Sequence, residues 1–249
     1  MTTKSSDLLA RAQRLGLWGL CQRWDQWGLE PWVEFLLAAE EEQRHQRSLD
    51  RRIHNAHLGS FHPMDVYDWA WPRKIDRAQI DDIFTFGFVK EAENILLLGP
   101  NGVGKTMIAQ NIAYQGLLRG FTVLFTSAST LLTDLAERDT AWARQQRLRR
   151  YVRPQLLVID EVGYLPFDTA AASLFFQLIA SRYESGSVVV TSNLAFSRWG
   201  ETLGDDVVAA ATIDRLVHHA QVISLDGESY RTRAHRTRPP PAATRGATT

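Results

Sequence analysis

The chain of 249 residues carries 28 basic and 28 acidic side chains, so its formal net charge is zero. Hydrophobic residues make up 45% and charged residues 22% of the sequence, which excludes a wholly disordered chain. The single cysteine excludes an internal disulfide, and the sequence shows neither an apolar leader nor an apolar run of about 18 residues. We therefore expect a cytoplasmic protein without membrane contact, and the length suffices for one large domain or for one domain with a small appendage.

The first part of the chain, residues 1–64, has the pattern of a small all-helical domain. Apolar residues at helical spacing predict a short helix over residues 8–15 and a long helix over residues 32–58. Pro31 and Gly59 stand where a helix begins and ends. Six of the eight tryptophans precede residue 72, and we expect most of them to be packing anchors rather than a docking surface.

Residues 65–230 have the alternating rhythm of an α/β domain. Five short apolar runs predict strands over residues 95–98, 123–125, 156–159, 188–190 and 222–225. Helical patterns separate the runs, over residues 105–119, 129–150, 170–183 and 207–218. Buried strands that alternate with helices predict a five-stranded parallel sheet covered on both faces. Residues 231–249 are rich in arginine and proline, and we expect them to form a flexible tail.

A glycine-rich motif directly follows the first predicted strand and opens the next helix. It reads GPNGVGKT over residues 99–106, which is the pattern of a P-loop. The backbone amides of such a loop can cradle a polyphosphate, Lys105 can reach the β and γ phosphates, and Thr106 can offer its hydroxyl to Mg²⁺. The strand and helix on either side disfavour the alternative, a glycine-rich turn without chemistry. We expect ATP to be held by Gly99, Pro100, Asn101, Gly102, Val103, Gly104, Lys105, Thr106 and Met107.

Polar residues end two of the later strands, at the edge where parallel sheets bind ligands. Asp160 and Glu161 follow the apolar run 156–159. We expect Asp160 to hold Mg²⁺ together with Thr106, and Glu161 to polarise an attacking water, which favours hydrolysis over transfer to a second substrate. Asn193 could orient that water or contact the γ phosphate, although a turn-forming asparagine is the simpler alternative for a strand end.

In this order the three motifs resemble those of the AAA+ ATPases, in which Asn193 matches the residue called sensor 1. Three further segments look like IstB, the ATP-binding helper protein encoded beside the IstA transposase in certain bacterial insertion sequences. They read DEVGYLP over residues 160–166, IDRLVHH over residues 213–219 and DGESY over residues 226–230. The resemblance covers about residues 8–233, and the same ATPase module is similar to that of the helicase loader DnaC.

The resemblance to IstB implies a Mg²⁺-dependent ATPase that assembles as a homo-oligomer on double-stranded DNA, with little sequence specificity, and recruits or activates an IstA-type transposase. It also implies that Arg215 is an arginine finger that enters the ATP site of a neighbouring subunit. From the sequence alone, a surface arginine paired with Asp214 is the simpler interpretation. The alternative functions are a DnaC-like replicative helicase loader, a nucleotide-gated adaptor without turnover, and a small-molecule kinase.

The sequence departs from the wider AAA+ pattern at its end. After Arg215 there is room for one strand and a tail but no helical lid, so we assign no sensor 2 arginine.

Five arginines and no acidic residue fall within residues 144–153. Such a run usually forms a solvated helix face. In related initiator and loader ATPases the element after the second strand touches DNA, so the resemblance makes residues 129–150 the expected DNA-facing element. Its candidate DNA-binding residues are Arg144, Arg147, Arg149 and Arg150. The arginine-rich tail is a second candidate for DNA contact, and Trp69 is a candidate neighbour of the adenine.

Overall fold

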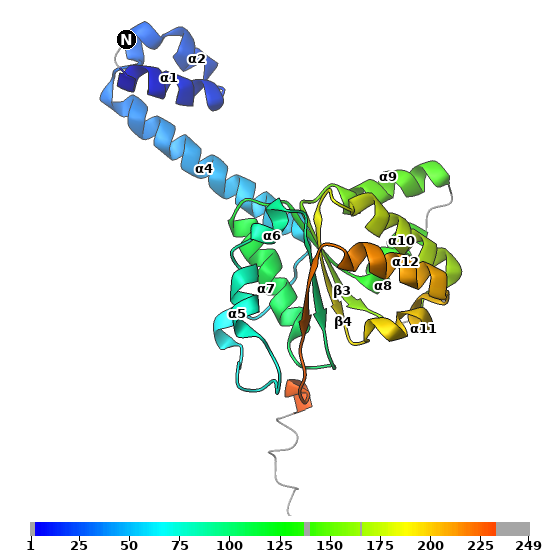
Figure 1. Ribbon diagram of the computed structural model, residues 1–249. Coiled ribbons are helices and arrows are strands. Elements are labelled where there is room, and N and C mark those ends of the chain that lie inside the picture. Colours follow the sequence, from blue (N-terminus) through cyan, green and yellow to red (C-terminus); the bar gives the residue numbers. More distant parts are fainter. Residues whose placement is uncertain (1–2, 137–139, 165, 233–249) are drawn as a thin grey trace, which may run out of the picture. The chain divides into compact units, whose positions relative to one another are not determined.

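The computed structural model describes residues 3–136, 140–164 and 166–232 (Figure 1). Contacts between residues divide the chain into two compact units, Met1–His54 and Asn55–Thr249, a division that comes earlier than the expected boundary after residue 64. No helix in the described ranges is long and apolar enough to cross a membrane. The tail expected over residues 231–249 lies outside these ranges, except for its first two residues.

The first unit consists of short helices around a small core. They are α1 (Thr3–Arg14), α2 (Trp18–Gln22), α3 (Trp24–Trp27) and, up to His54, the longer α4 (Pro31–Ala56). Their buried apolar side chains are Leu8, Ala12, Leu15, Leu20, Trp24, Val33 and Leu37. Trp24 is a packing anchor, as expected, and its indole nitrogen donates a hydrogen bond to Ser5 Oγ at 3.3 Å. Trp18 and Trp32 differ from that expectation, because they are 64% and 46% exposed.

The second unit is built on the five-stranded parallel sheet that the sequence predicts. Its strands are β1 (Asn94–Leu98), β2 (Val123–Ser127), β3 (Leu156–Val162), β4 (Ser187–Ser192) and β5 (Ala220–Ser224). They lie in the order β2-β3-β4-β1-β5, and every neighbouring pair is parallel. The central strands β3, β4 and β1 are almost wholly buried, which explains why their sequences are nearly continuous runs of valine, leucine and isoleucine.

Helices cover both faces of this sheet (Figure 1). On one face α7 (Lys105–Leu118) packs against β1 to β4, with α5 (Arg77–Ile83) and α6 (Gly87–Lys90) on the same side. On the other face lie α8 (Ala128–Ala136), α10 (Thr169–Arg182) and α12 (Asp206–Val217). The short elements are η1 (Met64–Val66), η2 (Phe196–Arg198), α11 (Trp199–Leu203) and η3 (Tyr230–Thr232). Up to residue 232, only η3 follows β5, so the described chain contains no helical lid.

The single helix expected over residues 129–150 is wrong, because the structure has two helices there. They are α8 (Ala128–Ala136) and α9 (Ala141–Val152), and residues 137–139 lie outside the described ranges. The side-chain oxygen of Thr140 accepts a hydrogen bond from the amide of Ala143 at 3.1 Å, which is an N-cap that begins a new helix. The four candidate DNA-binding arginines therefore all belong to α9.

A buried arginine ties α9 and α10 to the beginnings of β3 and β4. Arg182, at the end of α10, is 1% exposed, and burial lowers its pKa to about 10. Its guanidinium donates at 2.8–3.3 Å to five backbone carbonyls, those of Tyr151, Val152, Pro154, Gln155 and Ser187. Because these carbonyls lie at or before the first residues of two adjacent strands, Arg182 fixes the amino edge of the sheet.

Replacing Arg182 by methionine keeps a long side chain but removes the donor from five carbonyls. We expect the free energy of unfolding to fall by about 3 kcal/mol, because buried polar groups without partners are costly. Urea denaturation followed by circular dichroism measures this loss. Arg153→Met, which removes an exposed arginine near the same corner, is the control and should unfold close to the wild-type midpoint. Identical midpoints for Arg182→Met and wild type would show that the carbonyls do not depend on Arg182.

Candidate functional site

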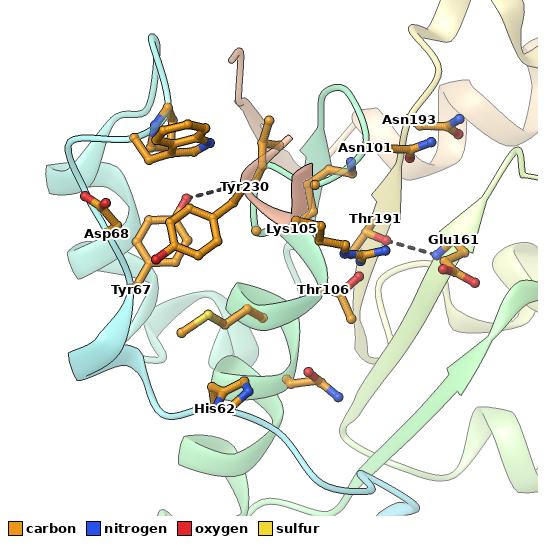
Figure 2. A pocket seen from close by; sticks show the side chains of 18 of the residues that line it. His62, Tyr67, Asp68, Asn101, Lys105, Thr106, Glu161, Thr191, Asn193 and Tyr230 are labelled. Carbon is orange, nitrogen blue, oxygen red and sulfur yellow. Dashed lines mark hydrogen bonds between the residues drawn. The ribbon is translucent and has the colours of Figure 1, made fainter. Parts of the chain in front are cut away.

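A cavity of about 820 Å³ lies at the carboxyl ends of β1, β3 and β4, and Figure 2 shows its lining side chains. This volume is within the usual range for a small-molecule or cofactor site. The expected site residues that line it are Asn101, Gly102, Val103, Gly104, Lys105, Thr106, Met107, Glu161 and Asn193. Motifs that are far apart in the chain therefore meet in one cavity.

The P-loop has the backbone shape that its glycines permit. Gly102 and Gly104 have φ angles of +81° and +97°, which lie in the left-handed region that favours glycine. A Cβ atom at Gly104 would collide with the ring of Tyr67, and one at Gly102 would collide with Ser229. Helix α7 begins directly after this loop, so the unpaired amides of its first turn add to the loop amides. The loop is therefore shaped to bind an anion.

The side chain of Lys105 lies against the backbone of the P-loop. Its side-chain Nζ donates hydrogen bonds to the carbonyls of Gly99 and Pro100, both at 2.7 Å, so these two residues contribute to the site through their backbone. Burial lowers the pKa of Lys105 to about 8, although the nearby carboxylate of Asp160 acts in the opposite direction. An anion bound in the loop would supply the countercharge that this buried amine needs.

Asp160 is only 6% exposed and is not part of the cavity lining, but it contacts two residues that are, Thr106 and Thr191. Its Oδ1 accepts hydrogen bonds from Thr106 Oγ1 at 3.1 Å and from Thr191 Oγ1 at 2.5 Å. A carboxylate beside a threonine hydroxyl is a pair of hard oxygen ligands, which is the chemistry that Mg²⁺ prefers. The residues present therefore fit the magnesium site expected at Thr106 and Asp160.

Glu161 is placed in the cavity by an irregularity in the sheet. The register between β3 and β4 shifts between Ile159 and Val162, and Glu161 has a φ of +61°. Such a bulge turns a side chain away from its regular direction. The amide of Glu161 donates a hydrogen bond to Thr191 Oγ1 at 2.9 Å (Figure 2). Thr191 therefore contacts both carboxylate residues, a role that the sequence analysis did not foresee.

Aromatic side chains form the wall opposite the strand ends, and the sequence did not assign Tyr67, Trp71 or Tyr230 to the site. Tyr67, Trp71 and Tyr230 line the cavity. The hydroxyl of Tyr67 donates a hydrogen bond to the carbonyl of Val103 at 2.9 Å, and burial raises the pKa of Tyr67 to about 12. Trp69, the expected neighbour of the adenine, is not part of this lining and packs edge-on against Tyr67 instead. The aromatic contact for a base would therefore come from Tyr67, Trp71 and Tyr230.

Arg215 lies on α12, outside the cavity of its own chain. Its guanidinium stands 4.6 Å from the centre of the Phe176 ring, and its Nη1 lies 3.4 Å from the carbonyl oxygen of Ala211. Among the described residues, Arg215 forms no ion pair with Asp214 or with another acid. The structure therefore does not bring Arg215 to the nucleotide motifs of the same chain.

The four candidate DNA-binding arginines of α9 lie in different surroundings. Arg147 forms an ion pair with Asp134 of α8, in which Arg147 Nε lies 2.5 Å from Asp134 Oδ2. Arg149 and Arg150 line a second cavity of about 540 Å³, together with Arg153 and the residues that begin β2. Arg150 also contacts His57 at 2.8 Å. Arg144 is exposed on the same helix.

Comparison with known proteins places the chain in a family. The family described as IstB-like ATP binding protein matches residues 19–238. A protein of Geobacillus stearothermophilus, named as an ATP-binding protein of insertion sequence IS5376, is 39% identical over 201 residues, which cover 81% of this chain and 80% of that protein. A protein of Pseudomonas aeruginosa, named as an ATP-binding protein of insertion sequence IS21, is 38% identical over 208 residues, covering 82% and 78% of the two chains.

Solved structures agree with the fold. The crystal structure of DnaI matches with a TM-score of 0.55 and 20% identity, over 69% of this chain and 90% of that one. The α/β fold with a P-loop AAA+ core, predicted from the motifs, is therefore confirmed. With a family match over most of its length and relatives of nearly 40% identity, the chain belongs to the family of IstB-like ATP-binding proteins.

Proposed function

We propose that the chain is a helper ATPase of DNA transposition. It binds ATP, assembles as a homo-oligomer on double-stranded target DNA, and recruits or activates a transposase of the IstA type. The observation that supports ATP hydrolysis is the meeting of Lys105, Thr106 and Glu161 in one cavity, with Asp160 hydrogen-bonded to Thr106 directly behind its lining. Membership of the family and the insertion-sequence relatives support the role in transposition.

The residues of the cavity divide the work of hydrolysis between them. The P-loop amides and Lys105 bind and neutralise the β and γ phosphates, while Thr106 and Asp160 hold Mg²⁺. Mg²⁺ held by Thr106 and Asp160 would supply stabilisation of the negative charge that develops on the phosphates. Glu161 orients the attacking water and accepts its proton, and Asn193 contacts that water or the γ phosphate from the end of β4.

Arg215 acts between subunits in this proposal. Because its guanidinium lies outside the cavity of its own chain, it can reach a nucleotide only in a neighbouring copy. An arginine supplied in this way stabilises the charge of the transition state. Hydrolysis would then depend on assembly, and assembly on DNA would stimulate turnover.

Contact with DNA is assigned to α9, through arginine contacts to phosphates that carry little sequence preference. Within this helix Arg149 is the better candidate, because it lines an open cavity with Arg153. Arg150 lines the same cavity, but its guanidinium also lies 3.9 Å from the carboxylate of Asp134. Arg147 is a weaker candidate than the sequence suggested, since Asp134 already binds its guanidinium. Arg144 is retained as an exposed member of the same helix.

A DnaC-like helicase loader remains the alternative function. The likeness to DnaI has 20% identity and supports the fold alone. The relatives of 38–39% identity are named for insertion sequences, and this favours transposition.

Two substitutions in the cavity should separate binding from hydrolysis. We expect Lys105→Ala to weaken ATP binding by roughly 100-fold or more, because it removes the cation that neutralises the phosphates. Glu161→Gln should keep the affinity for ATP but lower turnover by on the order of 10²-fold or more, because the base is lost. Binding of a fluorescent ATP analogue and release of phosphate, both with Mg²⁺ and DNA, measure the two effects.

Glu201→Gln is the control for Glu161→Gln, since Glu201 is a surface carboxylate paired with Arg198. This control should turn over ATP at the wild-type rate. Normal ATP affinity in Lys105→Ala would contradict the assignment of the P-loop. Normal turnover in Glu161→Gln would show that another residue activates the water.

The intersubunit role of Arg215 is tested by mixing variants. Arg215→Ala should bind ATP normally yet hydrolyse it on the order of 10³-fold more slowly. Lys105→Ala binds ATP poorly but carries an intact Arg215, so mixtures of the two should exceed the sum of their separate activities. As the control, Arg215→Ala mixed with the double variant Lys105→Ala/Arg215→Ala should give no gain. If co-assembled mixtures of the single variants stay at the sum, Arg215 does not act between chains.

A further inference from the structure

The segment that follows β5 lies against the nucleotide cavity and contributes Tyr230 and Arg231 to its lining. We call residues 225–231 the carboxy-terminal strap. Asp226 and Lys74 exchange two backbone hydrogen bonds, at 3.0 and 3.1 Å. The indole nitrogen of Trp71 donates to the carbonyl of Glu228 at 2.8 Å. The strap is therefore fastened along its length to the segment that carries the aromatic wall of the cavity.

The end of the strap is fastened to the P-loop itself. The amide of Tyr230 donates a hydrogen bond to the carbonyl of Gly102 at 2.9 Å. Ser229 occupies the space where a side chain of Gly102 would stand. The ring of Tyr230 packs edge-on against Trp71 at 5.5 Å and lies beside the P-loop in Figure 2. These contacts fix the backbone immediately before Arg231. The position of the Arg231 side chain therefore depends on the contacts between the strap and the P-loop.

Arg231 brings a second positive charge into the cavity. It belongs to the lining, as Lys105 does. Burial is the main cause of the lowered pKa of Lys105, and the charge of Arg231 acts in the same direction, so the two cations are close enough to repel each other. Among the described residues, no acid forms an ion pair with Arg231. Two cations that lie beside an anion-binding loop repel each other, and a polyanion that binds between them stabilises both.

We propose that Arg231 is a phosphate-binding residue, which contacts the polyphosphate chain of a nucleoside triphosphate seated on the P-loop of the same chain. The proposal rests on the nucleotide site proposed above. A guanidinium suits this task because its planar fork of donors can bind two phosphate oxygens at once. In this way a short strap supplies a cation from the carboxy-terminal side of the site, although the described chain has no lid domain.

The test compares how strongly each variant binds ATP and AMP, by competition with a fluorescent nucleotide. Arg231→Gln should weaken ATP binding by roughly tenfold to 100-fold, because a charge-assisted contact is lost. Its affinity for AMP should stay within about twofold of wild type, since AMP lacks the β and γ phosphates. Arg231→Lys keeps the charge and should recover part of the loss. Arg198→Gln removes a surface arginine that pairs with Glu201, and it should bind both nucleotides normally.

Two results would overturn the proposal. ATP affinity in Arg231→Gln within about twofold of wild type would show that Arg231 does not touch the polyphosphate. An equal loss of ATP and AMP binding, without recovery in Arg231→Lys, would show that the residue only positions the strap. Failure of the nucleotide site itself is a different result, because wild type would then fail to bind ATP, or Lys105→Ala would bind it normally.

Discussion

The buried carboxylate of Asp160 joins the sheet, the P-loop helix and the cavity. It accepts one hydrogen bond from Thr106 at the start of α7 and another from Thr191 at the end of β4. Thr191 in turn accepts the amide hydrogen of Glu161, where the chain departs from regular strand geometry. One hydrogen-bond network therefore positions the proposed metal ligands and the proposed base together. A substitution at any residue of this network would displace the metal ligands as well as the base.

Much of this arrangement could be predicted from the sequence. Parallel strands that are buried on both faces appear as continuous apolar runs, so all five strands were located. Parallel strands also bring their carboxyl ends to one edge, which is why Thr106 and Asp160, 54 residues apart, could be expected to meet. The bulge at Glu161 could not be foreseen, because its left-handed φ falls on a residue type that does not signal one.

The remaining features depend on contacts that leave no pattern in the sequence. Tyr67 and Trp71 come from segments without a motif, and the DGESY segment that carries Tyr230 gave no sign of its place in the cavity. Only the folded chain brings the three side chains to one wall. A run of arginines likewise predicts charge but not its partners, so the ion pair between Arg147 and Asp134 of the preceding helix was missed. The division into α8 and α9 was also missed, because its one sequence sign is the N-cap residue Thr140 inside an otherwise continuous helical pattern.

The most direct test of this account is the rate of ATP hydrolysis after the Thr191 hydroxyl is removed. Thr191→Val keeps the shape of the strand residue but removes its hydrogen bonds to Asp160 and Glu161. The account predicts that kcat falls by roughly 10- to 100-fold and that more Mg²⁺ is needed for half-maximal rate, while ATP affinity is retained. Thr191→Ser, which restores the hydroxyl, should recover most of the rate. A wild-type kcat and Mg²⁺ requirement in Thr191→Val would contradict the claim that this network positions the site.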